Sequence, residues 1–407
     1  MAYRPNKLGR IAIKIQGSGW GTAETTFAST TYIEAEVGVP KMVRESLRMD
    51  PIRSGFEEPE VLPGSRASIE IPVKFPLHGW SAATPTTDAT EHPDALLIRL
   101  ALGLAVQTGY VAANIASGGT TSSVKFTAAN TNWEGAGMLI PVSGTPGFEL
   151  IAMSDIDTTP TPDTGVPLVT MQRTPASSGA HYGSNTIYLS TDTPSPITMD
   201  WIGVDAGHHI RYSDGLVKSL KITGSVKKGP MLEATLRFTG TPAFPGAGGS
   251  LAAYSYGYPL IPVAVQANGA AMYFNGAWLT GVSETTFAVD CTLADVDGWG
   301  SPEGVAQQMV VDRKVSTSLL MPSTSSFTTD ILAPGTAITK LMAIFACGNA
   351  GRAAGYVLPA PTLIASSDFG DKNGLLAISY QAAPQVFAGD GGAGSGAGNK
   401  SARFIFA

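Results

Sequence analysis

A strict alternation of apolar and polar residues, followed by an almost wholly apolar helix, most constrains the fold of this chain. Between Ala67 and Phe75 every second residue is apolar, which is the period of a half-buried β-strand. Pro93 to Gly103 is typical of a helix, with proline in its first turn and glycine at its end. A helix that is apolar nearly all round must be covered, by its own sheet or by a neighbouring subunit. Its expected inter-subunit contacts are Leu96, Leu97 and Leu100.

A second short apolar helix is expected near the end of the chain. Thr336 can cap a run from Ala337 to Cys347, and Gly348 can stop it. The contact residues of this helix would be Ile338, Leu341 and Phe345. We expect both helices to present apolar surface to sister copies of the chain, which favours a protein that assembles.

The same order of structural signals occurs twice along the sequence: a strand, a long loop, a second strand, an apolar helix and a hairpin. In the first half the hairpin joins Gly215–Thr223 to Met231–Thr239. The second half has the strand Thr286–Leu293, the loop Asp295–Gln308, the strand Lys314–Pro322, and a hairpin of Gly355–Pro359 with Thr362–Ile364. Further strands are expected at Gly9–Gln16, Leu375–Tyr380 and Arg403–Phe406. We interpret the order as a duplication, with a chance match in a β-rich chain as the alternative.

The predicted fold is mainly β, with two tandem β-sandwich or barrel domains, each with a short flanking helix, and an inserted small β unit. The first domain combines residues 1–110 with 197–245, and the insertion spans 111–196. A linker at 246–260 leads to a second domain at 261–407. Glycine at 47 positions and proline at 28 indicate many short strands joined by turns.

A long polar segment from Pro40 to Arg66 separates two predicted strands. Loops of this length inside compact domains are usually functional or disordered. Basic and acidic residues alternate along it, which favours an ion-paired contact arm over a nucleic-acid site. The arm residues that we expect to make contacts are Arg44, Glu45, Arg48, Asp50, Arg53, Glu57 and Glu58.

Charge is scarce and slightly negative. Charged residues make up 14% of the chain, against about 25% in soluble domains, and the formal net charge is −6. A sparsely charged surface suits a protein covered by copies of itself, and a negative chain argues against one that grips phosphates. Without an apolar run of about 18 residues or signal-peptide features, we expect a cytosolic chain with no membrane partner. Cys291 and Cys347 are expected to be buried thiols.

Residues that could carry chemistry are few. No nucleophile elbow, phosphate-binding loop or paired-cysteine motif is present in the sequence. His208 and His209 could be combined with Asp200, Asp205 and Asp214 as a metal cluster, but neighbouring side chains in a strand point to opposite faces. Solvated turn histidines are the favoured interpretation. We therefore expect no enzyme, no cofactor and no metal.

Three short segments carry a family resemblance. Gly19–Glu24 follows the first strand, Gly64–Arg66 ends the arm, and Pro93–Leu97 leads to Gly103. Together they resemble the major tail proteins, or tail tube proteins, of long-tailed, siphovirus-type bacteriophages. Gly215–Gly240 and the segment from Gly348 to Tyr380 fit the later hairpins of that family. The insertion at 111–196 has no counterpart in it.

The resemblance implies a structural subunit whose rings stack into a hollow tube, with the inner sheets joined into one continuous barrel. Viral DNA passes through the bore without specific binding, and an acidic bore would repel it. Most such rings contain six tube domains, so a duplicated chain implies a homotrimeric, pseudo-hexameric ring, with a homohexamer as the alternative. The arm would then connect stacked rings. Further implied partners are tail terminator, tape-measure and tail-tip proteins, in a virion tail assembled in the host cytoplasm.

Two other classes of function stay open. A head-decoration, baseplate or tail-tip subunit could share the β class without forming a repeating tube. A glycan-binding or hydrolytic virion protein is the third class, and its only sequence support is a set of six scattered tryptophans.

Overall fold

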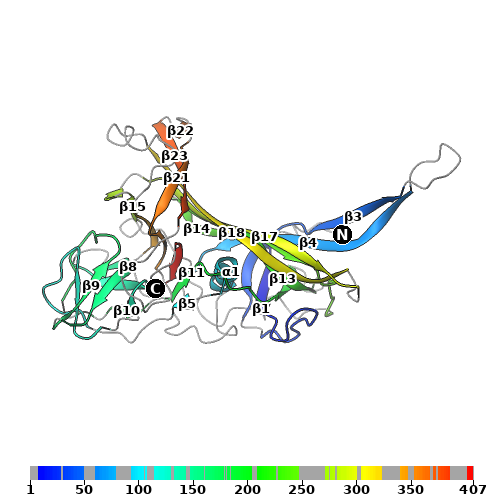
Figure 1. Cartoon of the computed structure of the whole chain (residues 1–407), viewed down its shortest axis with the longest axis horizontal. Coiled ribbons are helices and arrows are strands. Elements are labelled where there is room, and N and C mark those ends of the chain that lie inside the picture. The colour runs from blue at the N-terminus through cyan, green and yellow to red at the C-terminus, as the bar shows by residue number, and fades with distance from the viewer. Residues whose placement is uncertain are drawn as a thin grey trace.

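The computed structural model of the chain is built almost wholly of β-strands (Figure 1). The residues that it describes are 8–28, 31–49, 60–78, 93–104, 106–107, 114–129, 133–143, 147–159, 161–177, 179, 181–183, 185–203, 209–225, 228–246, 271–274, 276–279, 282–299, 304–322, 340–346, 353–366, 370–372, 375–385 and 401–406. Within these ranges the only α-helix is α1 (Pro93–Leu102). The prediction of a mainly β chain is confirmed.

Six strands close into a barrel. Their order is β12-β1-β2-β4-β14-β13, and β12 also pairs with β13, which completes the cylinder. The strands are β1 (Leu8–Ile15), β2 (Ile33–Val37), β4 (Glu60–Pro76), β12 (Ile197–Gly203), β13 (His209–Ser225) and β14 (Lys228–Phe238). In β4 the predicted alternation is confirmed, since Ile69, Ile71, Val73 and Phe75 are buried and the residues between them are not. The predicted hairpin of β13 with β14 is also confirmed.

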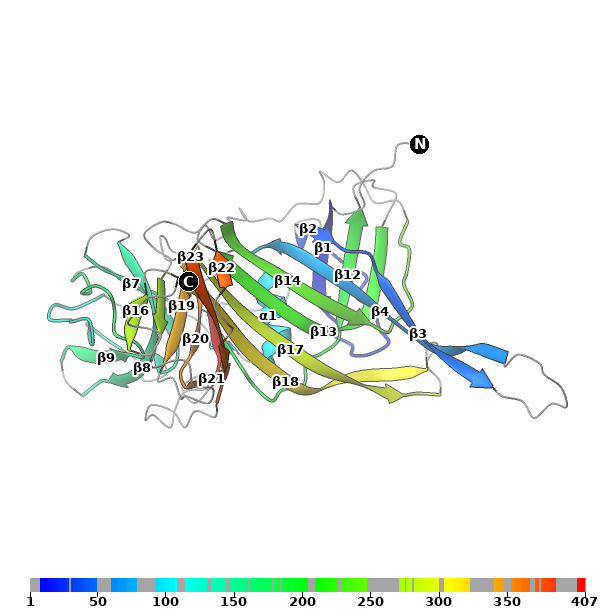
Figure 2. The ribbon, with the colours of Figure 1, turned by 90° about the horizontal axis from the view of Figure 1, so that it is seen from above.

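A half-barrel continues the same sheet beyond β13. Its order is β17-β18-β23-β21, and Figure 2 shows β14, β13, β17 and β18 side by side across the molecule. The strands are β17 (Glu284–Asp297), β18 (Val305–Pro322), β21 (Pro361–Ser366) and β23 (Leu375–Pro384). Two short flanking strands, β3 (Lys41–Met49) and β22 (Gly370–Lys372), pair with β4 and β23 respectively.

Two sequence predictions fail in this half-barrel. Both ends of the loop expected at Asp295–Gln308 are strand, because β17 and β18 stay paired as far as Asp297 and Val305. A two-stranded extension exposed to solvent needs no apolar face, so its residues carry no clear strand period. The expected hairpin of Gly355–Pro359 with Thr362–Ile364 is wrong as well, because these strands belong to different sheets.

A second sheet has the order β16-β15-β19-β20-β24-β11-β5. Its strands are β5 (Val106–Gln107), β11 (Asn185–Tyr188), β15 (Ala271–Phe274), β16 (Ala277–Leu279), β19 (Leu341–Ala346), β20 (Ala354–Leu358) and β24 (Arg403–Phe406). The last strand was expected from the sequence and is confirmed. It pairs with β20 on one side and with β11 on the other, so the end of the chain joins the two halves of this sheet.

The predicted second helix is wrong, because Leu341–Ala346 forms strand β19 between β15 and β20. Leu341 and Phe345 belong to the main core, whereas Met342 and Ile344 belong to a second core on the opposite face. A strand buried on both faces has a continuous apolar run, which periodicity cannot distinguish from a short buried helix. Ile338 and Cys347 lie outside the described residues.

The insertion forms a separate five-stranded sheet of order β10-β7-β8-β9-β6. Its strands are β6 (Val124–Phe126), β7 (Gly137–Pro141), β8 (Phe148–Asp157), β9 (Asp163–Pro167) and β10 (Tyr182–Gly183). It has its own core around Phe126 and Trp133. Leu139 and Leu150 pack with Met342 in the second core, which fixes the insertion to the second sheet. β11 falls inside the expected range 111–196 but belongs to the second sheet.

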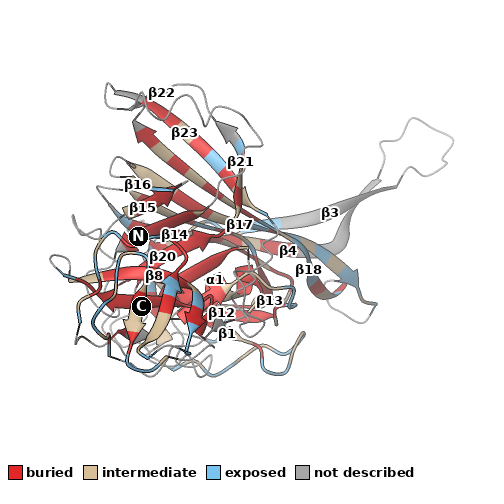
Figure 3. Ribbon diagram, turned by 60° about the vertical axis from the view of Figure 1, so that its left-hand side comes forward, coloured by how far each residue is buried: buried red, intermediate tan, exposed pale blue. Residues whose placement is uncertain are grey.

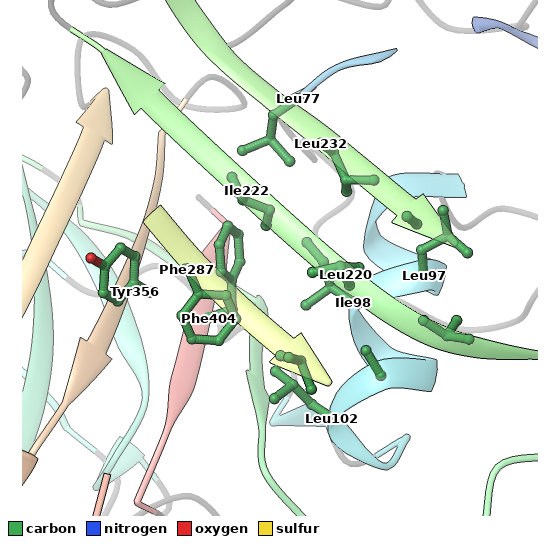
Figure 4. Packing of buried hydrophobic residues seen from close by; sticks show 14 of the residues in the cluster. Leu77, Leu97, Ile98, Leu102, Leu220, Ile222, Leu232, Phe287, Tyr356 and Phe404 are labelled. Carbon is green, nitrogen blue, oxygen red and sulfur yellow. The ribbon is translucent and has the colours of Figure 1, made fainter. Parts of the chain in front are cut away.

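Helix α1 is an internal part of the main core. Leu96 and Leu97 are fully buried, and 1% of Leu100 is exposed. The helix contacts β1, β11, β13 and β17. Figure 4 shows Leu97, Ile98 and Leu102 of the helix facing the sheet that carries Leu220. The predicted role of these leucines in contacts between subunits is therefore wrong. The sequence shows that the helix must be covered but not by which surface.

The predicted end of α1 is confirmed. Gly103 has a φ of 114°, and its N–H donates to the Arg99 carbonyl oxygen at 2.8 Å. A Cβ at this position would lie 2.5 Å from the Ser190 hydroxyl oxygen, so both the backbone conformation and the close approach require glycine.

The main core lies between the large sheet, α1 and the second sheet (Figure 3). Phe287 of the large sheet packs with Tyr356 and Phe404 of the second sheet, at ring-centroid distances of 5.1 and 5.7 Å. Cys291 is buried in this core, as expected, and burial raises its pKa to about 11. Apart from Gly246, the predicted linker lies outside the described residues.

Candidate assembly surface

Two four-stranded sheets with the same strand order lie edge to edge within the large sheet. Sheet unit 1 runs β2/β3, β4, β14, β13, and sheet unit 2 runs β17, β18, β23, β21. We count β2 and β3 together because they pair with successive parts of β4. In each unit the first two strands in chain order are neighbours on one side of the sheet. The last two follow with their order reversed.

The two sheet units also match in register. Pro76 ends β4 and Pro322 ends β18. When the two units are compared with these prolines matched, β14 pairs with β4 in the same register as β23 pairs with β18. In sheet unit 1, β13 then carries an extra residue, Lys218, at a register shift against β14. In sheet unit 2 the corresponding extra residue is Ile364, at the same level against β23. The two units therefore share strand order, register and bulge position.

The β13–β17 junction joins the two sheet units within one chain. It is antiparallel and runs from Ser219 opposite Asp290 to Ser225 opposite Glu284. Ile222 and Phe287 are opposite each other and fully buried, so the apolar face is continuous across the junction. The outer edge of sheet unit 1 is thus completed by the first strand of sheet unit 2.

The two ends of the joined sheet are free edges in the described part of the chain. At one end β1 covers β2 only as far as Glu36, and β3 pairs only with β4. At the other end β21 pairs only with β23. Both edges expose apolar side chains, with 87% of Val39, 55% of Met42 and 47% of Ile364 accessible. Unpaired edges with exposed apolar residues are ready templates for another chain.

Two hairpins project from the body in the same direction (Figures 1 and 2). The first is β3 with β4, so the predicted arm is a paired hairpin rather than an irregular loop. Arg44, Glu45 and Arg48 lie on β3. The other predicted arm residues lie outside the described residues, namely Asp50, Arg53, Glu57 and Glu58.

The second hairpin is β17 with β18, in which sequence reasoning predicted the strands Thr286–Leu293 and Lys314–Pro322 but missed the outer part. Its outer part exposes large apolar side chains, with 66% of Val311 and all of Trp299 accessible, together with Val296 and Met309. The missed signal was Val296 and Trp299 in the segment interpreted as a loop, together with Met309 and Val311 just beyond it. The two hairpins occupy the same position in the two sheet units.

The face of the large sheet opposite α1 carries charged residues of both signs. A cross-strand row contains Glu36, Lys74, Glu233 and Lys221 with alternating charge. Lys74 donates a hydrogen bond to Glu233, and this contact raises the pKa of the lysine. This row holds two carboxylates and two lysines and is therefore balanced in charge.

Further ion pairs balance charge on the same face. Lys218 Nζ lies 2.6 Å from Glu70 Oε1, and Arg237 Nη2 lies 2.5 Å from Asp295 Oδ2. Cross-strand pairs of opposite charge stabilise a sheet and leave few unpaired cations to bind phosphate.

Asp200 is a fully buried carboxylate where β12 and β13 close the barrel. Its Oδ2 accepts hydrogen bonds from the Tyr32 hydroxyl at 2.5 Å and pairs with His209 Nε2 at 2.6 Å. Its Oδ1 accepts from Arg211 Nε at 2.9 Å. The interpretation of His209 as a solvated turn histidine is wrong, since only 11% of its side chain is exposed. His208 and Asp205 lie outside the described residues.

The described residues contain no group of three or more His, Cys, Asp and Glu side chains that could hold a metal ion. The described part of the chain also has no helix with the length and apolar character needed to cross a membrane. No protein-family model matches the chain, and no curated protein shows significant sequence similarity to it.

Proposed function

We propose that this chain is the structural subunit of a phage tail tube. Three copies close a ring by joining their sheet units edge to edge, and the rings stack around a channel that carries viral DNA. The observation that carries the proposal is the joined pair of sheet units, which share one strand order and, among the described residues, leave opposite edges unpaired at the two ends. The segments that resemble tail tube proteins supply the biological setting.

The two sheet units are two copies of one tube domain in this proposal. Shared strand order, register and bulge position support a duplication, because β-bulges are specific features rather than defects. The geometry of the two edges supports ring closure. A contact between two different edges of like units is head-to-tail, and such contacts generate closed rings when the rotation permits. Closure would also remove the free edges that make an isolated copy prone to aggregation.

The face opposite α1 lines the channel in this arrangement. Lys74, Lys218 and Arg237 are engaged by carboxylates, so the face offers DNA few free cations. A surface of this kind suits transit without specific binding, because phosphate contacts would hold the DNA in place. The projecting hairpins lie in position to reach the next ring. Tail terminator, tape-measure and tail-tip proteins would be the further partners, within the virion tail.

A second candidate is a different virion structural protein, such as a head-decoration or tail-tip subunit. The observation that favours it is the inserted five-stranded sheet, which has its own core and lies at the end of the molecule away from the projecting hairpins (Figure 1). A glycan-binding role has less support. Among the described tryptophans, Trp299 is fully exposed, whereas only 5% of Trp133 is accessible.

Electron microscopy of the purified chain, combined with native mass measurement, tests the proposal. We expect rings with a mass three times the 42.1 kDa of one chain, and tubes at higher concentration. A mass six times that of the chain would support the homohexamer instead. Monomers that form neither rings nor tubes at high concentration would refute a tube function. A single layer on capsids or at the tail tip would favour the second candidate.

A further inference from the structure

We propose that β21 of one copy pairs antiparallel with the β2/β3 edge of the next copy, in the register of the β13–β17 junction. Ala365 then lies opposite Val43 of the neighbouring copy. This inference rests on the proposed ring and specifies which strands meet and how they are aligned. The partner is a second copy of the same chain, because the junction inside each chain shows how such edges fit together.

The first half of the derivation places β21 on β13. These are the strands with the extra residues Lys218 and Ile364. Ser219 follows the bulge in β13, and Ala365 follows the bulge in β21. Ala365 is therefore the counterpart of Ser219.

The second half places the β2/β3 edge on β17. Val43 is opposite Ser68 in β4, and Asp290 is opposite Lys314 in β18. Ser68 and Lys314 both lie eight residues before the aligned prolines at the ends of their strands. Val43 is therefore the counterpart of Asp290. Since Ser219 pairs with Asp290 inside the chain, Ala365 pairs with Val43 of the next copy.

Exposure at the two edges supports this register. Met42 is directly opposite Ile69, so it belongs to the apolar face of the sheet, yet 55% of it is accessible, against 7% of Ile69. The counterpart of Met42 inside the chain is Val289, which is fully buried against Leu220 at the β13–β17 junction. A neighbouring β21 would cover Met42 in the same way.

The end of β1 also agrees with this register. Pairing between β1 and β2 stops where Leu8 lies opposite Glu36. Within the part of the chain that the structure describes, the outer edge is therefore unpaired from Val37 onward, and this is the part that the neighbouring strand would occupy. β1 and the β21 strand of the neighbouring copy would occupy successive parts of the same edge without overlap.

Disulfide cross-linking tests the register directly. Opposite residues in an antiparallel pair have Cα atoms about 4.5–5.5 Å apart, which lies within the range that a disulfide spans. We expect the Val43→Cys/Ala365→Cys variant, after mild oxidation, to give a ladder of covalent dimers and trimers on a non-reducing gel. The ladder should stop at three copies because the ring closes. Peptide mapping should identify the 43–365 bond.

The chain offers a matched control at the equivalent position of its own junction. Ser219→Cys/Asp290→Cys should form a bond within one chain and leave the mass on the gel unchanged. Val43→Cys/Thr362→Cys is out of register and should give no bond between chains. A mixture of the two single variants, Val43→Cys and Ala365→Cys, should stop at dimers, which confirms a head-to-tail contact. Cys291 should contribute little background, because burial raises its pKa to about 11.

The outcomes separate the register from the function. Rings without a 43–365 bond, in a preparation whose 219–290 control is oxidised, would overturn the register and leave the ring intact. Absence of both rings and bonds between chains would overturn the proposed function as well, and a ladder beyond three copies would contradict closure by three chains. If the first variant does not fold, Met42→Cys/Ser366→Cys, the next pair in the same register, provides the same test.

Discussion

Replacing Asp200 by alanine should lower the free energy of unfolding by about 3–5 kcal/mol, the usual effect of removing one partner from a buried ion pair. The carboxylate is fully buried, and Arg211, its partner directly across the β12–β13 pair, has only 12% of its side chain exposed. Alanine would leave the guanidinium without a counter-charge and the Tyr32 hydroxyl without its acceptor. The loss falls where the barrel closes, so the whole barrel should be affected.

The matched control is Glu34, another carboxylate paired with an arginine of a neighbouring strand. It lies 3.1 Å from Arg10, but 81% of its side chain is exposed. Glu34→Ala should therefore change the free energy of unfolding by about 0.5 kcal/mol or less. Urea unfolding followed by far-UV circular dichroism measures both variants, with equal slopes required for the comparison.

A double variant tests the cause of the loss. The double variant Asp200→Ala/Arg211→Ala removes the unpaired guanidinium. Its loss of unfolding free energy should therefore be smaller than the sum of the losses in the two single variants, by about 1 kcal/mol or more. If the free energies of unfolding of Asp200→Ala and Glu34→Ala differ by less than about 1 kcal/mol, the assignment of Asp200 as the residue that stabilises barrel closure is refuted.

Three further predictions follow from the fold. Leu97→Ala should cost about 2–5 kcal/mol of unfolding free energy because Leu97 is fully buried in its own chain, and unchanged stability with loss of rings would restore the inter-subunit role of α1. Burial raises the pKa of Glu149 from 4.5 to about 6. Protonation of Glu149 should therefore stabilise the folded chain by about 2 kcal/mol below pH 4.5, and this stabilisation should be lost as pH rises through 6. Thermal unfolding at several pH values checks this, and Glu149→Gln should show no such step. Deleting Glu45 to Glu60 should leave rings that do not stack, whereas normal tubes in electron micrographs would contradict the role of the β3–β4 hairpin.

The sequence by itself determined the elements that have one solvent-exposed face and one buried face. The alternation in β4 and the hairpin of β13 with β14 could be predicted because a half-buried strand repeats every two residues, whatever it packs against. The end of α1 could be predicted because Gly103 adopts a backbone conformation that other residues rarely take. These are local properties of the chain.

The tertiary structure decided the elements whose surroundings are apolar on all sides or polar on all sides. β19 has one core on each face, so its apolar run lost the period that separates strand from helix. The outer part of the β17–β18 hairpin leaves Val296, Met309 and Val311 exposed to solvent, and its residues looked like a loop. In both cases the pattern that sequence reasoning needs depends on two unlike faces.

Only the tertiary structure decided which surface covers which. α1 had to be covered, and the fold places it beneath the large sheet of its own chain, while the uncovered apolar residues Met42 and Ile364 lie at the sheet edges. The candidate assembly surface rests on the pairing of β13 with β17 and on the edges of β3 and β21 that no described strand pairs with. Such pairings join segments far apart in the chain, and no local period records them.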